Sequence, residues 1–192
     1  MLRIDALNAI YPLLKDRIVV TNMGAAAELY SLGHRKGFFY MEHAMGLASS
    51  VGLGLALCLP KQRIVVVDGD GSVLMNLGTL STMARYRPPN LVHLIFDNES
   101  LLSVGGFPTA TSTGTDLEAI AKGAGIERTA TVREVEALEG VFSEAMAGEG
   151  LWAIVAKVDA VGPASFAMDV GLLENRFEFA RHIGELRGAS RR

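Results

Sequence analysis

The sequence predicts an open α/β fold, in which a mostly parallel sheet carries helices on both faces. Two apolar runs, residues 63–67 and 91–96, are rich in β-branched or aromatic residues and lack alternation, as strands buried on both faces do. Between them, residues 74–86 carry apolar side chains at helical spacing and stop before Pro88 and Pro89. This strand, helix and strand form a βαβ unit, for which a right-handed crossover is expected.

The rest of the chain continues the alternation of strands and helices. Its helical segments are amphipathic or, at residues 45–59, apolar and rich in small residues. We expect further helices at residues 5–14, 25–32, 45–59, 116–122, 133–147 and 170–186, and further strands at residues 17–20 and 152–158. These elements predict one domain over residues 1–187 and a C-terminal tail at residues 188–192.

The composition is that of a folded and weakly acidic protein. The chain has 192 residues, of which 49% are hydrophobic and 20% charged, and its formal net charge is −3. A chain of this length can bury enough surface in one core to fold without disulfides or metals, and its hydrophobicity excludes intrinsic disorder. Because no long basic run occurs, nucleic acid is not expected to be the main partner.

The sequence indicates a cytoplasmic protein. Residues 1–5 lack the charged-then-apolar order of a signal peptide, and no run of about 18 apolar residues could span a bilayer. The single cysteine, Cys58, cannot form an internal disulfide, and its apolar neighbours predict a small buried side chain. We therefore expect neither a membrane nor an oxidising compartment.

Polar and glycine-rich turns follow the two apolar strands, at residues 68–72 and 97–100. Ligands of open α/β sheets bind beyond the carboxyl ends of the strands, so both turns are expected at one site. The Asp70 carboxylate, the Asn98 amide oxygen and nearby backbone carbonyls suit Mg²⁺ or Ca²⁺ and are poor zinc ligands. The N–H groups of residues 71–73 open a helix and can bind phosphate. The pattern predicts a metal-bridged diphosphate.

Two other motifs do not fit the first turn. A calcium loop needs Gly where Val73 stands and Glu where Thr79 stands, and a dinucleotide fingerprint needs a third glycine where Leu74 stands. Taken alone, Gly69-Asp70-Gly71 is also compatible with an ordinary strand-end turn.

The full pattern is more specific, because Asn98 follows Gly69-Asp70-Gly71 after a gap of residues 72–97. This spacing matches the thiamine diphosphate signature. With residues 45–56 and 69–77, it makes most of residues 20–160 resemble the diphosphate-binding domain of thiamine-diphosphate-dependent decarboxylases. Within that family the chain is most similar to sulfopyruvate decarboxylase β subunits and to the matching part of phosphonopyruvate decarboxylases.

The resemblance implies specific ligands for thiamine diphosphate and Mg²⁺. Asp70, the Asn98 side chain and the Ser100 backbone carbonyl would hold the metal, and Gly71 and Ser72 would hold the diphosphate. The whole implied cofactor-binding set is His43, Met45, Gly69, Asp70, Gly71, Ser72, Asn98, Ser100 and Leu101.

Met45 and His43, which precede Gly46, have further implied roles. Met45 would hold the cofactor in its bent shape, and the His43 backbone carbonyl would accept a hydrogen bond from the exocyclic amine of the cofactor. Related enzymes usually have a small residue where His43 stands. The His43 side chain is therefore a candidate catalytic group that reaches the substrate, with a backbone-only role as the alternative.

Other histidines and methionines have simpler interpretations. His34, beside Arg35 and Lys36, belongs either to an anion-binding turn or to a solvated turn. We expect His93 in the core and His182 on an exposed helix. Met75 and Met83 are predicted to be core residues.

The hydroxyl-rich segment at residues 105–115 follows the implied metal ligands directly. It is either a mobile flap whose Ser and Thr hydroxyls meet an anionic substrate group, or a plain flexible loop.

The resemblance also implies a partner. In this family the catalytic glutamate belongs to a separate pyrimidine-binding domain, for which this chain has no room. We therefore expect an α subunit that completes the site in an α₂β₂ unit or a multiple, with residues 45–59 as the candidate contact. The expected reaction is decarboxylation of an anionic 2-oxo acid such as sulfopyruvate or phosphonopyruvate. The alternatives are a subunit of a thiamine carboligase or 2-oxo acid oxidoreductase, and a non-catalytic binding or assembly protein.

Overall fold

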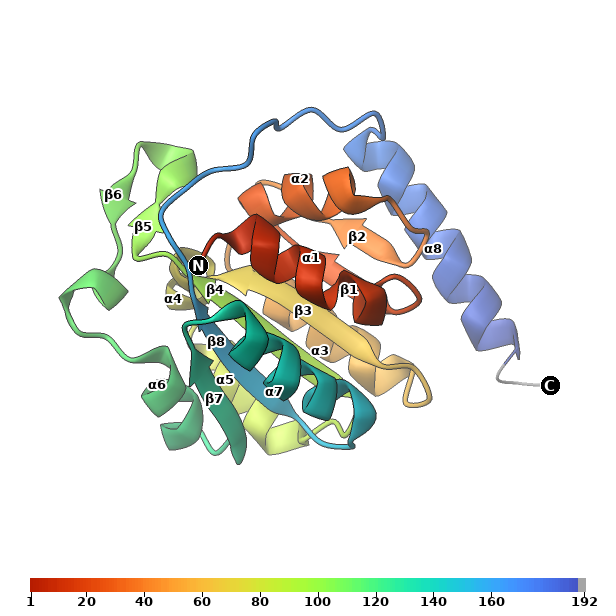
Figure 1. The fold of residues 1–192 in the computed structure, drawn as a ribbon. Coiled ribbons are helices and arrows are strands. Elements are labelled where there is room, and N and C mark those ends of the chain that lie inside the picture. The colour runs from red at the N-terminus through yellow and green to blue at the C-terminus, as the bar shows by residue number, and fades with distance from the viewer. Residues whose placement is uncertain (190–192) are drawn as a thin grey trace.

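The computed structural model describes residues 1–189, in which parallel strands form a six-stranded sheet of order β2-β1-β3-β4-β8-β7 (Figure 1). All neighbouring strands in this sheet pair in parallel. Its strands are β1 (Ile18–Thr21), β2 (Phe38–Tyr40), β3 (Ile64–Gly69), β4 (Leu91–Asp97), β7 (Arg128–Val132) and β8 (Trp152–Lys157). A small antiparallel pair is formed by β5 (Ser100–Leu101) and β6 (Phe107–Pro108).

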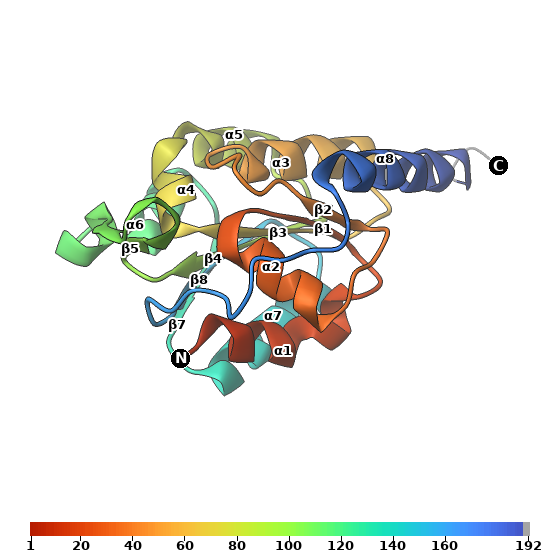
Figure 2. The same cartoon turned by 90° about the horizontal axis from the view of Figure 1, so that it is seen from above.

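Helices cover both faces of the sheet, so the predicted α/β class is confirmed (Figure 2). Helices α1, α2 and α7 pack into one hydrophobic core, and α3, α5, α6 and α8 pack into the other. The helices are α1 (Arg3–Leu14), α2 (Met23–Leu32), α3 (Ala48–Cys58), α4 (Asp70–Met75), α5 (Gly78–Tyr86), α6 (Leu117–Gly123), α7 (Val135–Ala147) and α8 (Leu172–Ala189), with 3₁₀ turns η1 (Leu102–Val104) and η2 (Ala110–Thr113).

The face on which a crossover helix lies depends on the direction of its crossover. The steps from β1 to β2 and from β7 to β8 run one way across the sheet, and α2 and α7 lie on the same face. The other steps run the opposite way, and α3, α5 and α6 lie on the opposite face. A constant crossover hand requires this arrangement. The direction reverses between β1 and β3, which is where α/β sheets form a ligand crevice.

The two predicted apolar strands form the centre of the sheet. Val65 and Val67 of β3 enter the core beneath α1 and α2, whereas Ile64 and Val66 enter the opposite core. Every residue of β4 is buried. Both faces of these strands are therefore covered, which explains why their sequences lack alternation.

The helix predicted at residues 74–86 is divided into α4 and α5. Helix α4 already begins at Asp70, and the chain turns at Asn76, whose side-chain Nδ2 donates to the Gly46 carbonyl at 2.8 Å. This break turns Met75 outward, so the prediction of a core residue was wrong there: Met75 is 55% exposed, whereas Met83 is buried as predicted.

The predicted helix at residues 45–59 begins only at Ala48, because residues 41–47 form turns after β2. Cys58 is exposed, which contradicts the predicted burial; it is the last residue of α3 and its side chain faces away from the sheet side of the helix.

Strands β2 and β7 were not predicted. Strand β2 has only 3 residues, and most of β7 is polar or exposed. Both are edge strands with a single neighbour, so neither needs the long apolar run of a central strand.

The C-terminal helix α8 continues through Ala189. The first residues of the predicted tail at 188–192 are therefore helical, and residues 190–192 lie outside the described residues. Within residues 1–189, no helix combines the length and apolar character that crossing a membrane would require.

Replacing Gly52 with alanine tests the close approach of α3 to β3. An added Cβ would lie 2.1 Å from Val66 Cγ2, so we expect Gly52→Ala to lower the free energy of unfolding by about 1–3 kcal/mol. Gly54 is the matched control, because its Cβ position has no heavy atom within 4 Å. Gly54→Ala should stabilise the helix by about 0.5–1 kcal/mol. Urea denaturation measures both changes, and equal effects would contradict the packing argument.

Candidate active site

The carboxyl ends of β1, β3 and β4 meet at a cavity of about 250 Å³. The predicted cofactor-binding residues that line it are Met45, Gly69, Asp70, Gly71, Ser72, Asn98, Ser100 and Leu101. His43 does not line this cavity. It lines an adjoining one with Met23, Met45 and Phe166, and its side chain is 86% exposed. The structure therefore gathers the predicted set, with His43 at its margin.

The start of helix α4 forms one wall of the cavity. Gly69 occupies the N-cap in an extended conformation and makes no side-chain cap, so the first N–H groups of the helix are not occupied by a capping side chain. Leu101 leaves no room for a side chain at Gly71, because a Cβ there would lie 2.2 Å from Leu101 Cδ2. A larger residue would push Leu101 out of the cavity wall.

The Ser72 hydroxyl joins three segments of the chain. Its Oγ accepts hydrogen bonds from Asn22 Nδ2 and from the Gly46 amide, both at 2.9 Å. Asn22 directly follows β1 and was not predicted as a site residue. The signal that could have revealed it is its position, a polar residue at a strand end on the ligand-binding edge.

A buried hydrogen-bonded pair of side chains lies directly beneath the turn. Asp68 Oδ2 lies 3.2 Å from His93 Nε2, and both side chains are fully buried. Burial alone would raise the pKa of Asp68, but the hydrogen bond and charge of His93, with hydrogen bonds from Ser72 and Asn22, hold that pKa below its usual range. His93 is a core residue as predicted, and within residues 1–189 its Nδ1 has no hydrogen-bond partner.

Asp70 receives two hydroxyl groups from the segment after β6. Thr109 Oγ1 donates to Asp70 Oδ2 at 2.5 Å, and Thr111 Oγ1 lies 3.2 Å from the same oxygen. Burial raises the pKa of Asp70; the Thr109 hydrogen bond opposes this rise and the nearby Asp97 charge adds to it. The Asp70 carboxylate is thus held in a desolvated position beside a second acid.

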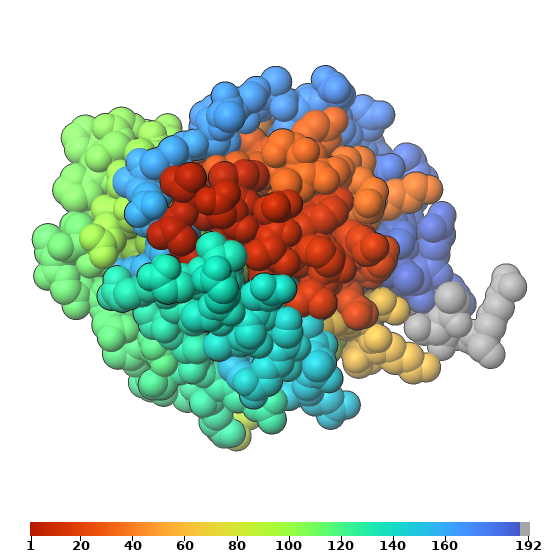
Figure 3. Space-filling model, in the orientation of Figure 1, coloured from red at the N-terminus to blue at the C-terminus, as the bar shows by residue number. Residues whose placement is uncertain are grey.

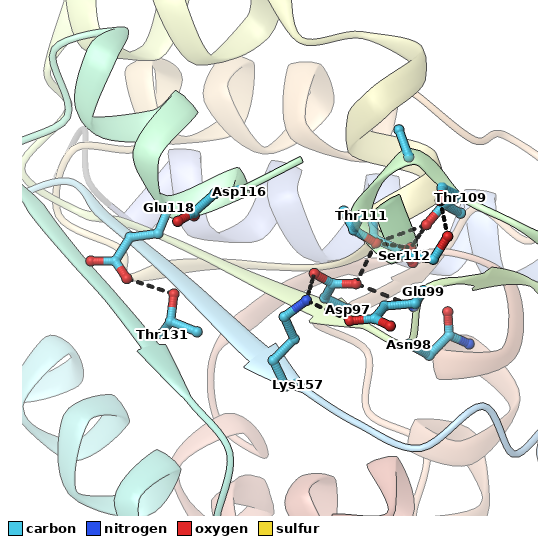
Figure 4. Close-up of polar contacts among 12 residues, drawn as sticks. Asp97, Asn98, Glu99, Thr109, Thr111, Ser112, Asp116, Glu118, Thr131 and Lys157 are labelled. Carbon is cyan, nitrogen blue, oxygen red and sulfur yellow. Dashed lines mark hydrogen bonds and ion pairs between the residues drawn. The ribbon is translucent and has the colours of Figure 1, made fainter. Parts of the chain in front are cut away.

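That second acid, Asp97, has its own cation. Lys157 Nζ lies 2.7 Å from Asp97 Oδ2 and 3.0 Å from Glu99 Oε1. Thr111 Oγ1 donates to Asp97 Oδ1 at 2.8 Å, as Figure 4 shows. The pKa of Lys157 is raised, because its hydrogen bonds to Asp97 and Glu99 outweigh the opposing effect of desolvation.

These contacts correct the expectation that the hydroxyls of residues 105–115 face the substrate. Thr109 turns inward onto Asp70, and Thr111 turns inward onto Asp97. Figure 4 shows the second of these contacts. The hydroxyls of Ser112 and Thr113 donate to backbone carbonyls within the same segment. Whether the segment moves as a flap stays a prediction.

The turn after β4 presents the other implied metal ligands. Asn98 Oδ1 accepts a hydrogen bond from the Ser100 amide at 3.1 Å, and Glu99 between them has a left-handed φ of 59°. The donor set of Asp70 carboxylate, Asn98 amide oxygen and Ser100 carbonyl consists only of hard oxygen atoms, which fits Mg²⁺. In the part of the chain that the structure describes, no group of three or more His, Cys, Asp or Glu side chains forms a metal site.

Backbone strain gathers at the edge of both cavities. Met23 and Glu42 adopt left-handed φ angles of 50° and 30°, although neither is glycine. The Met23 amide donates to the Glu42 carbonyl at 2.9 Å, which ties the two strained residues together. Strain of this kind collects where a ligand site imposes the backbone shape.

The connection from β8 to α8 closes the far side of the cavity. Residues 158–171 run along the surface beside α1 and α2 (Figure 3), and Pro163 and Phe166 line the cavity. Arg3 lines it as well, but its guanidinium pairs with the Glu28 carboxylate at 2.6 and 3.1 Å.

The remaining predicted histidines have structural contacts. His34 lies 3.1 Å from the Tyr40 hydroxyl and 2.6 Å from Glu178 of α8. Its ring therefore joins β2 to α8. Arg35 and Lys36 beside it are exposed, as the solvated-turn alternative expects. His182 on α8 is only partly exposed, with 27% of its side chain accessible.

Comparison with known proteins identifies the family. The family model "Thiamine pyrophosphate enzyme, C-terminal TPP binding domain" matches residues 20–156. This chain belongs to that family. The predicted thiamine-diphosphate-binding fold is thereby confirmed.

Curated relatives extend the similarity over most of the chain. A sulfopyruvate decarboxylase subunit beta from Methanocaldococcus jannaschii is 43% identical over 157 residues, which cover 81% of this chain and 82% of the relative. The protein of the same name from Methanothermobacter thermautotrophicus is 39% identical over 98% of this chain and 97% of its own length. Phosphonopyruvate decarboxylase from Streptomyces viridochromogenes is 44% identical over 71% of this chain, but this covers only 34% of that longer protein. The predicted enzyme class, a thiamine-diphosphate-dependent decarboxylase subunit, agrees with these names.

Solved structures agree on the fold. A putative thiamin diphosphate-dependent enzyme from Mycobacterium smegmatis matches with a TM-score of 0.69 at 24% identity, covering 82% of this chain and 31% of that one. A 2-oxoglutarate:ferredoxin oxidoreductase from Magnetococcus marinus also has a TM-score of 0.69, at 16% identity, covering 93% of this chain and 66% of that one. At such identities the likeness shows the fold alone.

Removing His93 tests the buried contact with Asp68. His93→Leu removes the His93 hydrogen bond to the buried Asp68 carboxylate, which keeps its donors from Asn22 and the Gly69 amide, so we expect the free energy of unfolding to fall by about 1–3 kcal/mol. His182→Leu is the control, because a partly exposed side chain should change stability by no more than about 0.5 kcal/mol. Chemical denaturation at neutral pH measures both. Equal losses would show that the His93–Asp68 contact does not stabilise the fold.

Proposed function

We propose that this chain is the β subunit of a Mg²⁺- and thiamine-diphosphate-dependent decarboxylase that acts on an anionic 2-oxo acid of the sulfopyruvate or phosphonopyruvate type. The main support for this proposal is that Asp70, Asn98, Ser100 and the start of helix α4 all line one cavity. The near full-length similarity to proteins named sulfopyruvate decarboxylase subunit beta supports the choice of reaction.

The diphosphate end of the cofactor has a suitable binding surface. Mg²⁺ would be held by Asp70, the Asn98 amide oxygen and the Ser100 carbonyl. The amides of Gly71 and Ser72 would bind the diphosphate at the positive end of α4. Asn22 and Gly46 hold the Ser72 side chain through hydrogen bonds, so the turn is already organised for this role. When bound, thiamine diphosphate supplies the electron sink for loss of CO₂.

Met45 and His43 would serve the reactive end of the cofactor. Met45 lines both cavities and would support the bound cofactor between its two ends. The largely exposed His43 ring lies beyond it, at the margin that a partner subunit would cover. We assign the His43 side chain to substrate contact and its backbone carbonyl to the cofactor amine.

An α subunit would complete the site. Large apolar side chains are exposed on segments that bound the two cavities: Leu47, Leu102, Val104, Phe107 and Phe166. Such side chains suit a covered interface better than water. This surface includes Leu47 from the predicted contact at residues 45–59 and adds the segments after β4 and β8. A cytoplasmic location stays a prediction of the sequence.

A thiamine carboligase subunit is the second candidate. An Escherichia coli protein named acetolactate synthase isozyme 3 large subunit is 44% identical, but over only 48 residues, or 25% of this chain. The shared part is too short to favour that reaction over decarboxylation. A non-catalytic role is disfavoured because Asp70, Ser72 and Asn98 are all retained around the cavity.

Cofactor binding gives a direct test. Calorimetry with thiamine diphosphate and Mg²⁺, on the chain co-expressed with a candidate α subunit, should show binding that Asp70→Ala abolishes, because the only carboxylate in the metal set is lost. Asp16→Ala is the matched control, since Asp16 is exposed at the amino end of β1. No binding by the wild-type complex, or undiminished binding by Asp70→Ala, would refute the site.

Turnover tests the reaction and the role of His43. The complex should decarboxylate sulfonate- or phosphonate-bearing 2-oxo acids, and this chain alone should not. We expect His43→Ala to lower kcat/KM by about tenfold to a hundredfold, the loss of one hydrogen bond to a charged substrate group, while cofactor affinity is retained. Activity equal to wild type in His43→Ala would assign His43 a backbone-only role. A purified chain that turns over 2-oxo acids at a normal rate by itself would exclude the α subunit.

A further inference from the structure

Two threonines of the segment after β6 form hydrogen bonds with Asp70 and Asp97. The proposed cofactor binding does not explain these hydrogen bonds. Thr109 and Thr111 are only 6% and 5% exposed, and both hydroxyls point at buried carboxylates. In a segment otherwise largely exposed, two buried hydroxyls on one pair of acids form a specific arrangement.

We propose that Thr109 and Thr111 are positioning residues, which hold the Asp70 carboxylate toward the metal and hold Asp97 away from it. The inference rests on the proposed function, because it concerns the metal of that same site. It adds that the two threonine hydroxyls determine which of the adjacent acids, Asp70 or Asp97, becomes the metal ligand.

The number of hydroxyl protons shows how the two threonines are shared between Asp70 and Asp97. Each hydroxyl has one proton to donate. Thr109 donates to Asp70 at 2.5 Å. Thr111 Oγ1 lies 2.8 Å from Asp97 Oδ1 and from Thr109 Oγ1, and 3.2 Å from Asp70; of the two nearer acceptors the ionised carboxylate is the stronger. Each carboxylate thus receives one hydroxyl.

Only one of these carboxylates has a cation among the described residues. Lys157 lies 2.7 Å from Asp97 Oδ2 and compensates its charge, with Thr111 on the other oxygen, Oδ1. Figure 4 shows Asp97 held between Lys157 and Thr111. Asp70 lacks such a neighbour in residues 1–189, so the acid that lines the cavity is the one whose charge a metal ion would balance.

The position of the Thr109 hydrogen bond also matters. Thr109 donates to Asp70 Oδ2, and Oδ1 receives no hydroxyl in the described structure. This hydrogen bond restrains the rotation of the carboxylate and leaves Oδ1 as the oxygen available to a metal. Mg²⁺ needs nearly ideal octahedral geometry, so an Asp70 free to rotate would bind it less well, whereas Ca²⁺ tolerates irregular geometry.

One short hairpin links two of the implied ligands, Asn98 and Ser100, to the positioning threonines, whereas Asp70 lies at the start of α4. Strand β5 begins at Ser100, the implied ligand, and pairs with β6, where Ser100 faces Pro108. The Thr109 amide then donates to the Glu99 carbonyl at 3.1 Å. The threonines are therefore placed by the same turn that presents Asn98 and Ser100, and metal binding and hairpin order should be coupled in both directions.

The test is metal titration of the complex with its α subunit at saturating thiamine diphosphate. We expect Thr109→Val to weaken Mg²⁺ binding by about 10–100-fold, as loss of a ligand's hydrogen-bond partner does. Ca²⁺ affinity should fall by a clearly smaller factor. Thr109→Ser keeps the hydroxyl and should bind like wild type. Thr113→Val is the matched control, because Thr113 is exposed and bonds only to the Ala110 carbonyl.

Thr111→Val provides the second variant. Without the Thr111 hydroxyl, Asp97 loses a donor and competes with Asp70, so Mg²⁺ binding should again weaken more than Ca²⁺ binding. If Thr109→Val does not fold, the Thr111→Val and Thr111→Ser pair decides the question. Independently, amide hydrogen exchange of residues 109–113 in the wild-type complex should slow when Mg²⁺ is added.

The outcomes separate the two proposals. A wild-type complex that binds neither Mg²⁺ nor thiamine diphosphate would overturn the proposed function and this inference together. Wild-type binding that the threonine-to-valine variants share, or equal losses for Mg²⁺ and Ca²⁺, would overturn the inference alone. Unchanged exchange of residues 109–113 would contradict the coupling.

Discussion

The in-register pairing of β3 with β4 is the constraint on which the site depends. Asp68 pairs with Ile95 and Gly69 with Phe96, so the two strands end at nearly the same level. The turn that begins at Asp70 therefore lies beside Asp97 and Asn98. Because parallel strands point the same way, this single register brings separate acidic turns to one edge of the sheet.

This pairing places three buried aspartates close together, which is electrostatically unfavourable. Neighbouring residues compensate two of the three charges. Asp68, Asp70 and Asp97 are each no more than 3% exposed. His93 pairs with Asp68, and Lys157 pairs with Asp97. Asp70 has neutral hydroxyl donors and no paired cation in the described structure. Burial and the nearby Asp97 charge raise its pKa, and the threonine hydrogen bonds oppose that rise. The charge without a cation lies where the cavity opens, at the start of a helix whose positive end favours phosphate.

Large apolar side chains are also exposed at the same edge of the sheet. Phe107 and Phe166 are 65% and 59% exposed beside the cavities. Similarity to proteins named as β subunits agrees with a site that another chain completes. The longer phosphonopyruvate decarboxylase, of which this chain matches 34%, is consistent with a further domain carried in one polypeptide. The proposed diphosphate turn and the exposed apolar side chains then lie at the same edge of the sheet.

The local sequence was sufficient for the central elements and for the binding turns. The apolar runs of β3 and β4 and the glycine-rich turn after β3 are determined by side chains within a few residues of one another, and their spacing to Asn98 carried the family resemblance. Burial on both strand faces, and the ligand-binding edge of a parallel sheet, follow from such local patterns. The short edge strands β2 and β7 had no comparable signal, since an edge position tolerates short or polar sequences.

Contacts between distant segments were decided only by the tertiary structure. Asn22 reaches Ser72 across 50 positions, and Thr109 reaches Asp70 across 39. A hydroxyl-rich loop has the same sequence whether it faces a substrate or two buried acids, and His34 could not reveal its contact with Glu178 across 144 positions. Residue types and strand-end spacing determined where the chemistry lies and what kind of ligand it suits. Packing decided which donor meets which carboxylate, because that depends on how the hairpin after β4 folds back over the strand ends.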